Sequence, residues 1–222
     1  TSLYIATEKE LLQYTVYQKQ SVPRKILDLP SGGRHTTRSL LFGHDGYLYV
    51  SIGSTCNVCH EKNPLVAGIY QVDVRAKQPV LTPFATGLRN AVFMTENPIT
   101  HELVVTEMGR DFLGDTTPPD EINIVTKGGN YGWPVCYGKN IHDRAFDDQA
   151  IDPCREPFAL PSFIDLPAHS APLGLTYIPA GWPEDWAGNM LVALHGSWNS
   201  TKPVGYSLVR LIVDPEGRYY GS

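Results

Sequence analysis

The sequence predicts an all-β fold, and three observations lead to that prediction. The 222-residue chain contains 20 Gly and 18 Pro, a composition typical of short strands joined by turns. Apolar runs of about five residues recur along it, which is the usual length of a β-strand. Long helical periodicities are few. With 42% hydrophobic residues, the chain also has enough apolar material to bury a sizeable core.

The apolar runs belong to a repeated unit. First strands are expected at residues 3–7, 48–52, 103–107 and 190–194, and second strands at 11–17, 68–74, 121–125 and 206–213. Further strands precede most of the first ones, for example at 39–43 and 174–179. Each unit therefore supplies three or four antiparallel strands, which is the content of a β-propeller blade, and about four to five blades are represented. A β-sandwich is the alternative.

The repeats indicate a single domain covering residues 1–222. The spacing between first strands is longest after residue 103, where a loop insertion at about 128–161 is rich in Gly, Asp and Pro. No Ser/Gly/Pro-rich linker separates two cores. The chain opens on Thr1 without a leader pattern, so we expect a fragment or a processed chain, and the propeller is predicted to be incomplete.

Charge and hydropathy exclude two classes of partner. The formal net charge is −5, and no cluster of Lys and Arg suits a phosphate backbone, so no nucleic-acid partner is expected. No apolar run approaches the ~20 residues that span a bilayer. A small-molecule or protein partner is therefore predicted.

The four cysteines fall as two pairs, Cys56 with Cys59 and Cys136 with Cys154. Two disulfides are the favoured interpretation, and they imply an oxidising compartment. The first pair also forms a CxxCH string with His60, which is the pattern of covalent haem c attachment. A disulfide is favoured over haem because the string falls in a polar loop between two strands.

Five segments together resemble the soluble quinoprotein glucose/sorbosone dehydrogenases, and the HGSW string and Cys pairs are nearest the sorbosone-dehydrogenase-like branch. The segments cover residues 29–53, 85–90, 109–136, 166–179 and 192–199. The resemblance implies a six-bladed propeller that binds pyrroloquinoline quinone (PQQ) and Ca²⁺. It also implies that parts of the first and last blades are missing.

The resemblance assigns the chemistry to a few residues. His35 matches the general base, and an imidazole suits removal of a hydroxyl proton during hydride transfer. Arg89 and Asn90 match the residues that contact the cofactor, Arg89 also stabilising the reduced quinone oxygen, because a tricarboxylate quinone requires planar cations and amide donors.

The remaining site predictions concern the metal and the cavity walls. The backbone carbonyls of Gly109 and Arg110 are expected to bind Ca²⁺, which favours oxygen ligands. His169, His195, Trp198 and Arg110 are expected at the cofactor, with packing of Trp198 between blades as the alternative for that residue. Asp120 and Glu121 are interpreted as solvated acids of a turn.

The predicted function is oxidation of a sugar or aldose-type alcohol by hydride transfer to PQQ, in a periplasmic or secreted protein that passes electrons to a cytochrome or quinone. Two departures from the family pattern keep other functions open. Ser54 stands where glucose-oxidising members have Asp, and His195 replaces a Lys. The alternatives are a non-catalytic propeller that binds protein or carbohydrate, and a Ca²⁺-dependent lactonase. Unpaired sheet edges of an incomplete propeller would favour association with another chain.

Overall fold

The all-β prediction is confirmed. The computed structural model describes residues 2–16, 22–214 and 217–222, and over these ranges the regular elements are strands, without a helix. No helix in these ranges could cross a membrane. The expected strand at 11–17 runs to residue 15, and its predicted last residue lies outside the described ranges.

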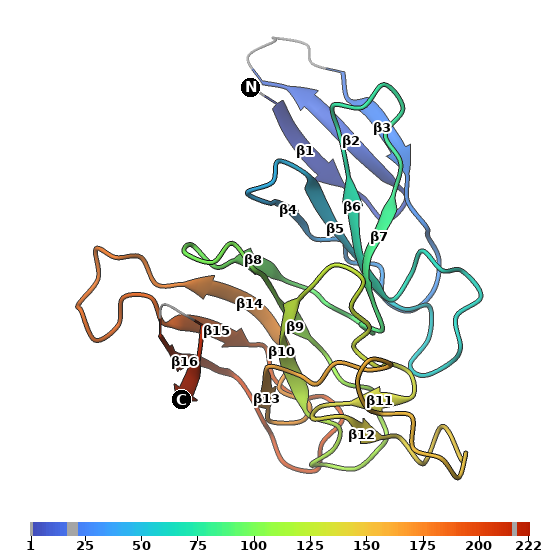
Figure 1. Cartoon of the computed structure of the whole chain (residues 1–222), viewed down its shortest axis with the longest axis vertical. Coiled ribbons are helices and arrows are strands. Elements are labelled where there is room, and N and C mark those ends of the chain that lie inside the picture. Colours follow the sequence, from blue (N-terminus) through green and yellow to red (C-terminus); the bar gives the residue numbers. More distant parts are fainter. Residues whose placement is uncertain (1, 17–21, 215–216) are drawn as a thin grey trace.

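Four antiparallel sheets form successive blades (Figure 1). The first blade holds β1 (Ser2–Ala6), β2 (Glu10–Thr15) and β3 (Arg24–Asp28). The second holds β4 (Leu40–Phe42), β5 (Leu48–Ile52), β6 (Gly68–Val72) and β7 (Thr82–Thr86). The third holds β8 (Met94–Glu96), β9 (Leu103–Glu107), β10 (Asp120–Val125) and β13 (Ile164–Leu166). The fourth holds β14 (Pro172–Tyr177), β15 (Met190–Leu194), β16 (Ser207–Val213) and β17 (Tyr219–Gly221).

The inner strands of the four blades are neighbours. β1 contacts β4, β4 contacts β8, and β8 contacts β14. Each blade therefore begins at the centre of the molecule and is built outwards. The segments that lead into β4, β8 and β14 share one face with the loops that follow β9 and β15, and we call it the cavity face. The β4–β5 and β8–β9 turns lie on the opposite face, which we call the turn face.

Apolar packing between blades explains the sequence of the first strands. All five positions of β5 and of β9 are buried. Successive side chains point to opposite sides of a strand, so Val50 packs toward the first blade and Tyr49 toward the third. In the same way, Val105 packs toward the second blade and Val104 toward the fourth. A blade covered on both sides requires apolar runs in place of alternation.

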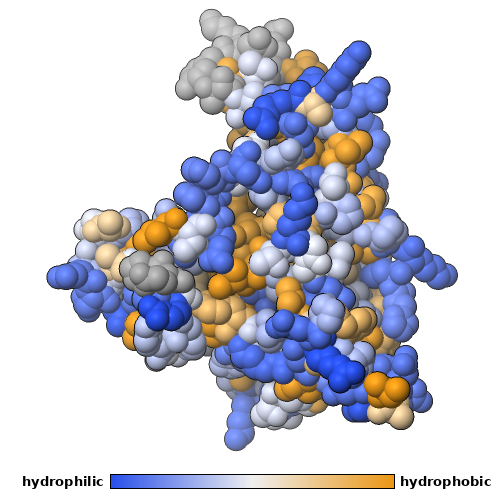
Figure 2. Space-filling view, in the orientation of Figure 1, coloured by the Kyte–Doolittle hydropathy of each residue, from blue (hydrophilic) through white to orange (hydrophobic). Residues whose placement is uncertain are grey.

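The outer blades leave apolar side chains exposed. On the first blade these include Leu3 and Ile5, and on the fourth blade Leu173 and Leu208. Hydrophobic residues are also visible around the centre of the face drawn in Figure 2, among a mainly hydrophilic outline.

Both predicted disulfides are present. Cys56 is bonded to Cys59, and Cys136 is bonded to Cys154. The second bond lies in the segment between β10 and β13, which also forms the hairpin of β11 (Cys136–Tyr137) and β12 (Ile141–His142). The Cys56 and Cys59 sulfurs are bonded to each other, so they are not available for thioether bonds to haem. Two disulfides fit an oxidising compartment.

The packing between blades makes a stability prediction at Ile69. This side chain is fully buried between the second and third blades. We expect Ile69→Ala to lower the free energy of unfolding by about 2–5 kcal/mol, because it removes buried methyl groups and leaves a cavity. Ile99→Ala is the matched control, since Ile99 is 60% exposed, and its effect should stay within about 0.5 kcal/mol. Urea denaturation measures both, and equal effects would contradict the assigned core.

Candidate active site

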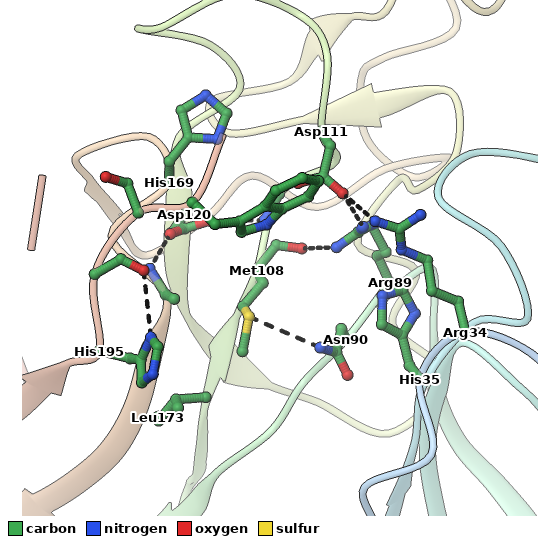
Figure 3. Close-up of a pocket in the computed structure, with 15 residues that line it drawn as sticks. Arg34, His35, Arg89, Asn90, Met108, Asp111, Asp120, His169, Leu173 and His195 are labelled. Atoms are coloured by element: carbon green, nitrogen blue, oxygen red, sulfur yellow. Dashed lines mark hydrogen bonds and ion pairs between the residues drawn. The ribbon is translucent and has the colours of Figure 1, made fainter. Parts of the chain in front are cut away.

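A cavity of about 350 Å³ opens on the cavity face (Figure 3). Its walls come from the second, third and fourth blades. Seven of the eight residues that the sequence predicts for the cofactor, the base or the metal line it: His35, Arg89, Asn90, Gly109, His169, His195 and Trp198. The Arg110 side chain lies elsewhere.

The fold brings these residues together because each lies at a strand end on the cavity face. His35 precedes β4, Asn90 precedes β8, and His169 precedes β14. Gly109 follows β9, and His195 follows β15. Loops that emerge at one end of a rigid scaffold commonly carry binding residues.

The protonation of His35 follows from its hydrogen bonds. Its Nδ1 lies 3.0 Å from the Ser54 carbonyl oxygen and 2.9 Å from Ser54 Oγ. Ser54 Oγ donates its own proton to the Cys56 carbonyl at 2.7 Å. Both neighbours of Nδ1 therefore accept, so Nδ1 carries the proton and Nε2 keeps a lone pair. Nε2 makes no hydrogen bond within the described part of the chain, and it is free to act as a base.

The surroundings of His35 disfavour its charged form. Burial first, and then the positive charge of Arg89, lower the pKa of His35 to about 4. The ring is packed closely against Gly53, where an added Cβ would lie 2.5 Å from the His35 Cβ. A larger residue at position 53 would therefore displace the imidazole.

Arg89 is buried and almost completely hydrogen-bonded. It is 4% exposed. Its Nε donates to the Asn57 carbonyl at 2.8 Å, and Nη2 donates to Asn57 Oδ1 at 2.8 Å and to Asp111 Oδ2 at 3.3 Å. Its Nη1 donates to the Met108 carbonyl at 3.2 Å. A guanidinium has five N–H groups, so Arg89 retains about one for a ligand.

Arg34 and Asp111 are cavity residues that the sequence interpretation missed. Arg34 Nη2 donates to Asp111 Oδ2 at 2.9 Å, so one carboxylate bridges Arg34 and Arg89. The Arg34 side chain is 42% exposed, and this ion pair is its single side-chain hydrogen bond within the described residues. Arg34 therefore offers more free donors to the cavity than Arg89 does. Its position beside His35 in the sequence was the available signal.

The interpretation of Asp120 and Glu121 as solvated turn acids was wrong. Both begin β10 and are buried. Asp120 accepts the Gly109 amide at 2.8 Å, the Ala171 amide at 2.7 Å and the Ser170 hydroxyl at 3.2 Å. It thereby connects the loop after β9 to the segment before β14. Burial raises the pKa of Asp120, and it raises that of Glu121 to about 7.

Glu107, the last residue of β9, positions Asn90. Its Oε1 accepts a hydrogen bond from the backbone amide of Asn90 at 2.9 Å. Glu107 pairs with Glu121 in the β9–β10 ladder. Burial raises the pKa of Glu107 well above its usual range, because a carboxylate loses its hydration there.

The remaining wall contains two imidazoles and an indole. His169 Nε2 donates to the Gly114 carbonyl at 2.7 Å, so Nδ1 of that ring can accept from a ligand. His195 is exposed and lies across the cavity from Arg34 and Arg89 (Figure 3). Trp198 is 69% exposed and meets Phe112 edge to face. Its packing between blades, the alternative interpretation, is therefore wrong.

The Arg110 side chain is turned toward the insertion. Its Nη2 donates to Asp143 Oδ1 at 2.9 Å, and both residues are buried. The metal prediction concerned the backbone, where neither the Gly109 nor the Arg110 carbonyl accepts a hydrogen bond from the described residues. Both oxygens therefore remain available as ligands.

The fold and cavity define a β-propeller whose axial cavity is lined by arginine and imidazole groups. The TrAA12-like family model matches residues 1–218, and the chain belongs to that family. An uncharacterized protein of Borreliella burgdorferi is 37% identical over 175 residues, which are 77% of this chain and 44% of that protein.

Two solved structures share the fold. The calcium structure of the Trichoderma reesei Carbohydrate-Active Enzymes Family AA12 protein has a TM-score of 0.84 at 22% identity, covering 98% of this chain and 64% of that one. The holo form of the pyranose dehydrogenase PQQ domain from Coprinopsis cinerea has a TM-score of 0.77 at 18% identity, covering 99% and 64%. This chain thus spans about two thirds of these structures and less than half of the Borreliella relative.

The buried carboxylate of Asp120 makes a second prediction. We expect Asp120→Asn to lower the free energy of unfolding by about 1–3 kcal/mol, because an amide nitrogen cannot accept the Gly109 or Ala171 amide proton and leaves it unsatisfied. Exposed Asp185→Asn is the control and should leave the urea midpoint unchanged. An Asp120→Asn midpoint equal to that of the control would show that Asp120 does not hold the two segments together.

Proposed function

We propose that the cavity is the cofactor and substrate site of a PQQ-dependent sugar dehydrogenase. One observation carries the proposal: His35, which is neutral and has a free Nε2, lines the same cavity as the two arginines Arg34 and Arg89. A base without charge suits proton removal from an alcohol. Arginines suit recognition of a polycarboxylate. One of the related structures is the PQQ domain of a pyranose dehydrogenase and the other is a calcium structure of an AA12 protein, which agrees with this chemistry.

The residues present fit the cofactor and its metal. A cavity of about 350 Å³ lies within the ~300–1,000 Å³ range of small-molecule sites. Arg34 would bind a carboxylate of the cofactor with its free N–H groups, while the side-chain amide of Asn90 would donate a hydrogen bond to the cofactor. The free carbonyls of Gly109 and Arg110 are oxygen ligands of the kind that Ca²⁺ favours. Trp198, at the exposed rim, would stack on the sugar. When bound, PQQ would supply the hydride acceptor, and Ca²⁺ would polarise it as a Lewis acid.

The protein then supplies binding and proton transfer. His35 Nε2 accepts the proton of the substrate hydroxyl, and Ser54 holds the ring in the required tautomer through Nδ1. Burial and Arg89 oppose the resulting imidazolium. An anionic ligand beside Arg34 and Arg89 offsets their charge, which raises the proton affinity of His35 as the site fills. We further propose a periplasmic or secreted location, since the two disulfides fit an oxidising compartment.

Titration of the Ca²⁺-loaded protein with PQQ, followed by a panel of aldoses, tests the function. We expect PQQ to bind and the sugars to reduce it, which is observed as a change in the absorbance of the quinone. Arg34→Ala should weaken PQQ binding about tenfold or more, which corresponds to loss of a charge-assisted hydrogen bond. Arg75→Ala, an exposed arginine remote from the cavity, should leave the affinity unchanged. Absence of PQQ binding to the parent chain would overturn the proposal.

The role of His35 makes a separate prediction. His35→Gln should lower turnover by about 10²–10⁴-fold, the usual contribution of a general base. PQQ affinity should change little, because Arg34 and Asn90 remain. His60→Gln, a substitution of an exposed histidine outside the cavity, should retain full turnover. Loss of PQQ binding together with turnover would assign His35 to cofactor binding and not to proton transfer.

The titration of His35 checks the same assignment before any cofactor is added. Its pKa in the folded chain, about 4, lies below the ordinary value near 6.5. His35 therefore contributes stability above pH 6.5 that is lost as the pH falls toward 4. We expect the NMR signal of the His35 ring to titrate well below pH 6. An anionic ligand in the cavity should raise that midpoint. A midpoint near 6.5 in the free protein would contradict the described environment.

A further inference from the structure

A second cluster of side chains lies on the turn face, at the opposite ends of inner strands β4 and β8. It consists of His44, Glu96 and His101, whose ligand atoms all lie within 4.8 Å of one another. The cavity function does not involve these residues. They border a separate cavity of about 210 Å³, which Asp45 and Glu102 also line.

The backbone holds this cluster in place. His44 lies in the β4–β5 turn, and its amide donates to Glu96 Oε2 at 2.7 Å, which links the second and third blades. His101 lies in the β8–β9 turn, and its amide donates to the Asn97 carbonyl at 2.9 Å. Asn97 Oδ1 accepts two further amides of the same turn. Short turns on paired strands therefore present all three side chains.

The three side chains lie close enough together to bind one ion. His101 Nδ1 lies 2.7 Å from Glu96 Oε1. The His44 and His101 rings stack at a centroid distance of 3.8 Å and an interplanar angle of 15°. A neutral imidazole is a metal ligand.

We propose that His44, Glu96 and His101 bind a divalent transition-metal ion, with Zn²⁺ as the representative. Two imidazole nitrogens and one carboxylate oxygen form a three-ligand set that zinc uses, with water at the fourth position. The ion takes the place of the proton shared by His101 and Glu96, and the stacked rings, both on exposed side chains, tilt so that their in-plane lone pairs converge. The carboxylates of Asp45 and Glu102 add negative charge around the site. Nitrogen ligands disfavour Ca²⁺, which prefers oxygen.

The proposed ion joins two blades. His44 belongs to the second blade, and Glu96 and His101 belong to the third. An ion that binds the folded chain and not the unfolded one raises the melting temperature. Because its ligands come from two blades, the ion would fasten the turn face.

Zinc titration of the full chain, by equilibrium dialysis with metal analysis, tests the proposal. We expect the parent chain to bind one equivalent of Zn²⁺ that His44→Gln and His101→Gln each lose, with at least a tenfold fall in affinity. His60→Gln and His195→Gln are the matched controls, because they remove an exposed histidine outside the cluster and one from the main cavity. Both controls should keep the equivalent.

A second readout does not depend on counting sites. Zn²⁺ should raise the melting temperature of the parent chain and of His60→Gln, but not that of His44→Gln. Co²⁺ should give the visible absorption of a low-coordinate nitrogen and oxygen site in the parent chain and in His60→Gln, but not in His44→Gln. Retention of the zinc equivalent and of the melting shift by His44→Gln would overturn the proposal, as would a parent chain that binds no zinc.

Discussion

The cavity depends on how the chain accommodates the buried charge of Arg89. A guanidinium that is 4% exposed is tolerated when its N–H groups are paired. Here the partners are Asn57 from the loop after β5, and Met108 and Asp111 from the loop after β9. Arg89 itself precedes β8. One charge thus ties together three segments from two blades, and those segments form the wall on which the other site residues stand.

The same charge sets the chemistry of its neighbours. Burial lowers the pKa of His35, and the charge of Arg89 adds to that effect. The ion pair of Arg89 with Asp111 places that carboxylate where it also binds Arg34. Asp111 is shared between two arginines, so the pairing leaves positive charge at the cavity wall. An anionic ligand would neutralise the remaining positive charge of Arg34 and Arg89, and the pKa of His35 would then rise. Structural pairing and ligand preference therefore have a common electrostatic origin.

Most of the fold could be predicted from the sequence, because blades packed on both sides require uninterrupted apolar strands such as β5 and β9. The site was found less completely. His35 and Arg89 were located through a family pattern, whereas Arg34 and Asp111 look like ordinary charged loop residues until the blades bring them together. Asp120 follows two prolines and was interpreted as a turn residue. Its burial comes from the segment before β14, about fifty residues later in the chain, which no local pattern reveals.

The inner strand β8 connects the residues of the main cavity to the cluster of His44, Glu96 and His101. Asn90 precedes the strand at the cavity face, where its amide is held by Glu107, and Glu96 ends it at the turn face, where its carboxylate holds His44. The two clusters border separate cavities at opposite ends of the inner strands. An ion on Glu96 would therefore not touch a substrate in the main cavity. What it can do is fix the far end of a strand whose near end presents Asn90, so that the second and third blades keep the spacing on which the Arg89 network depends.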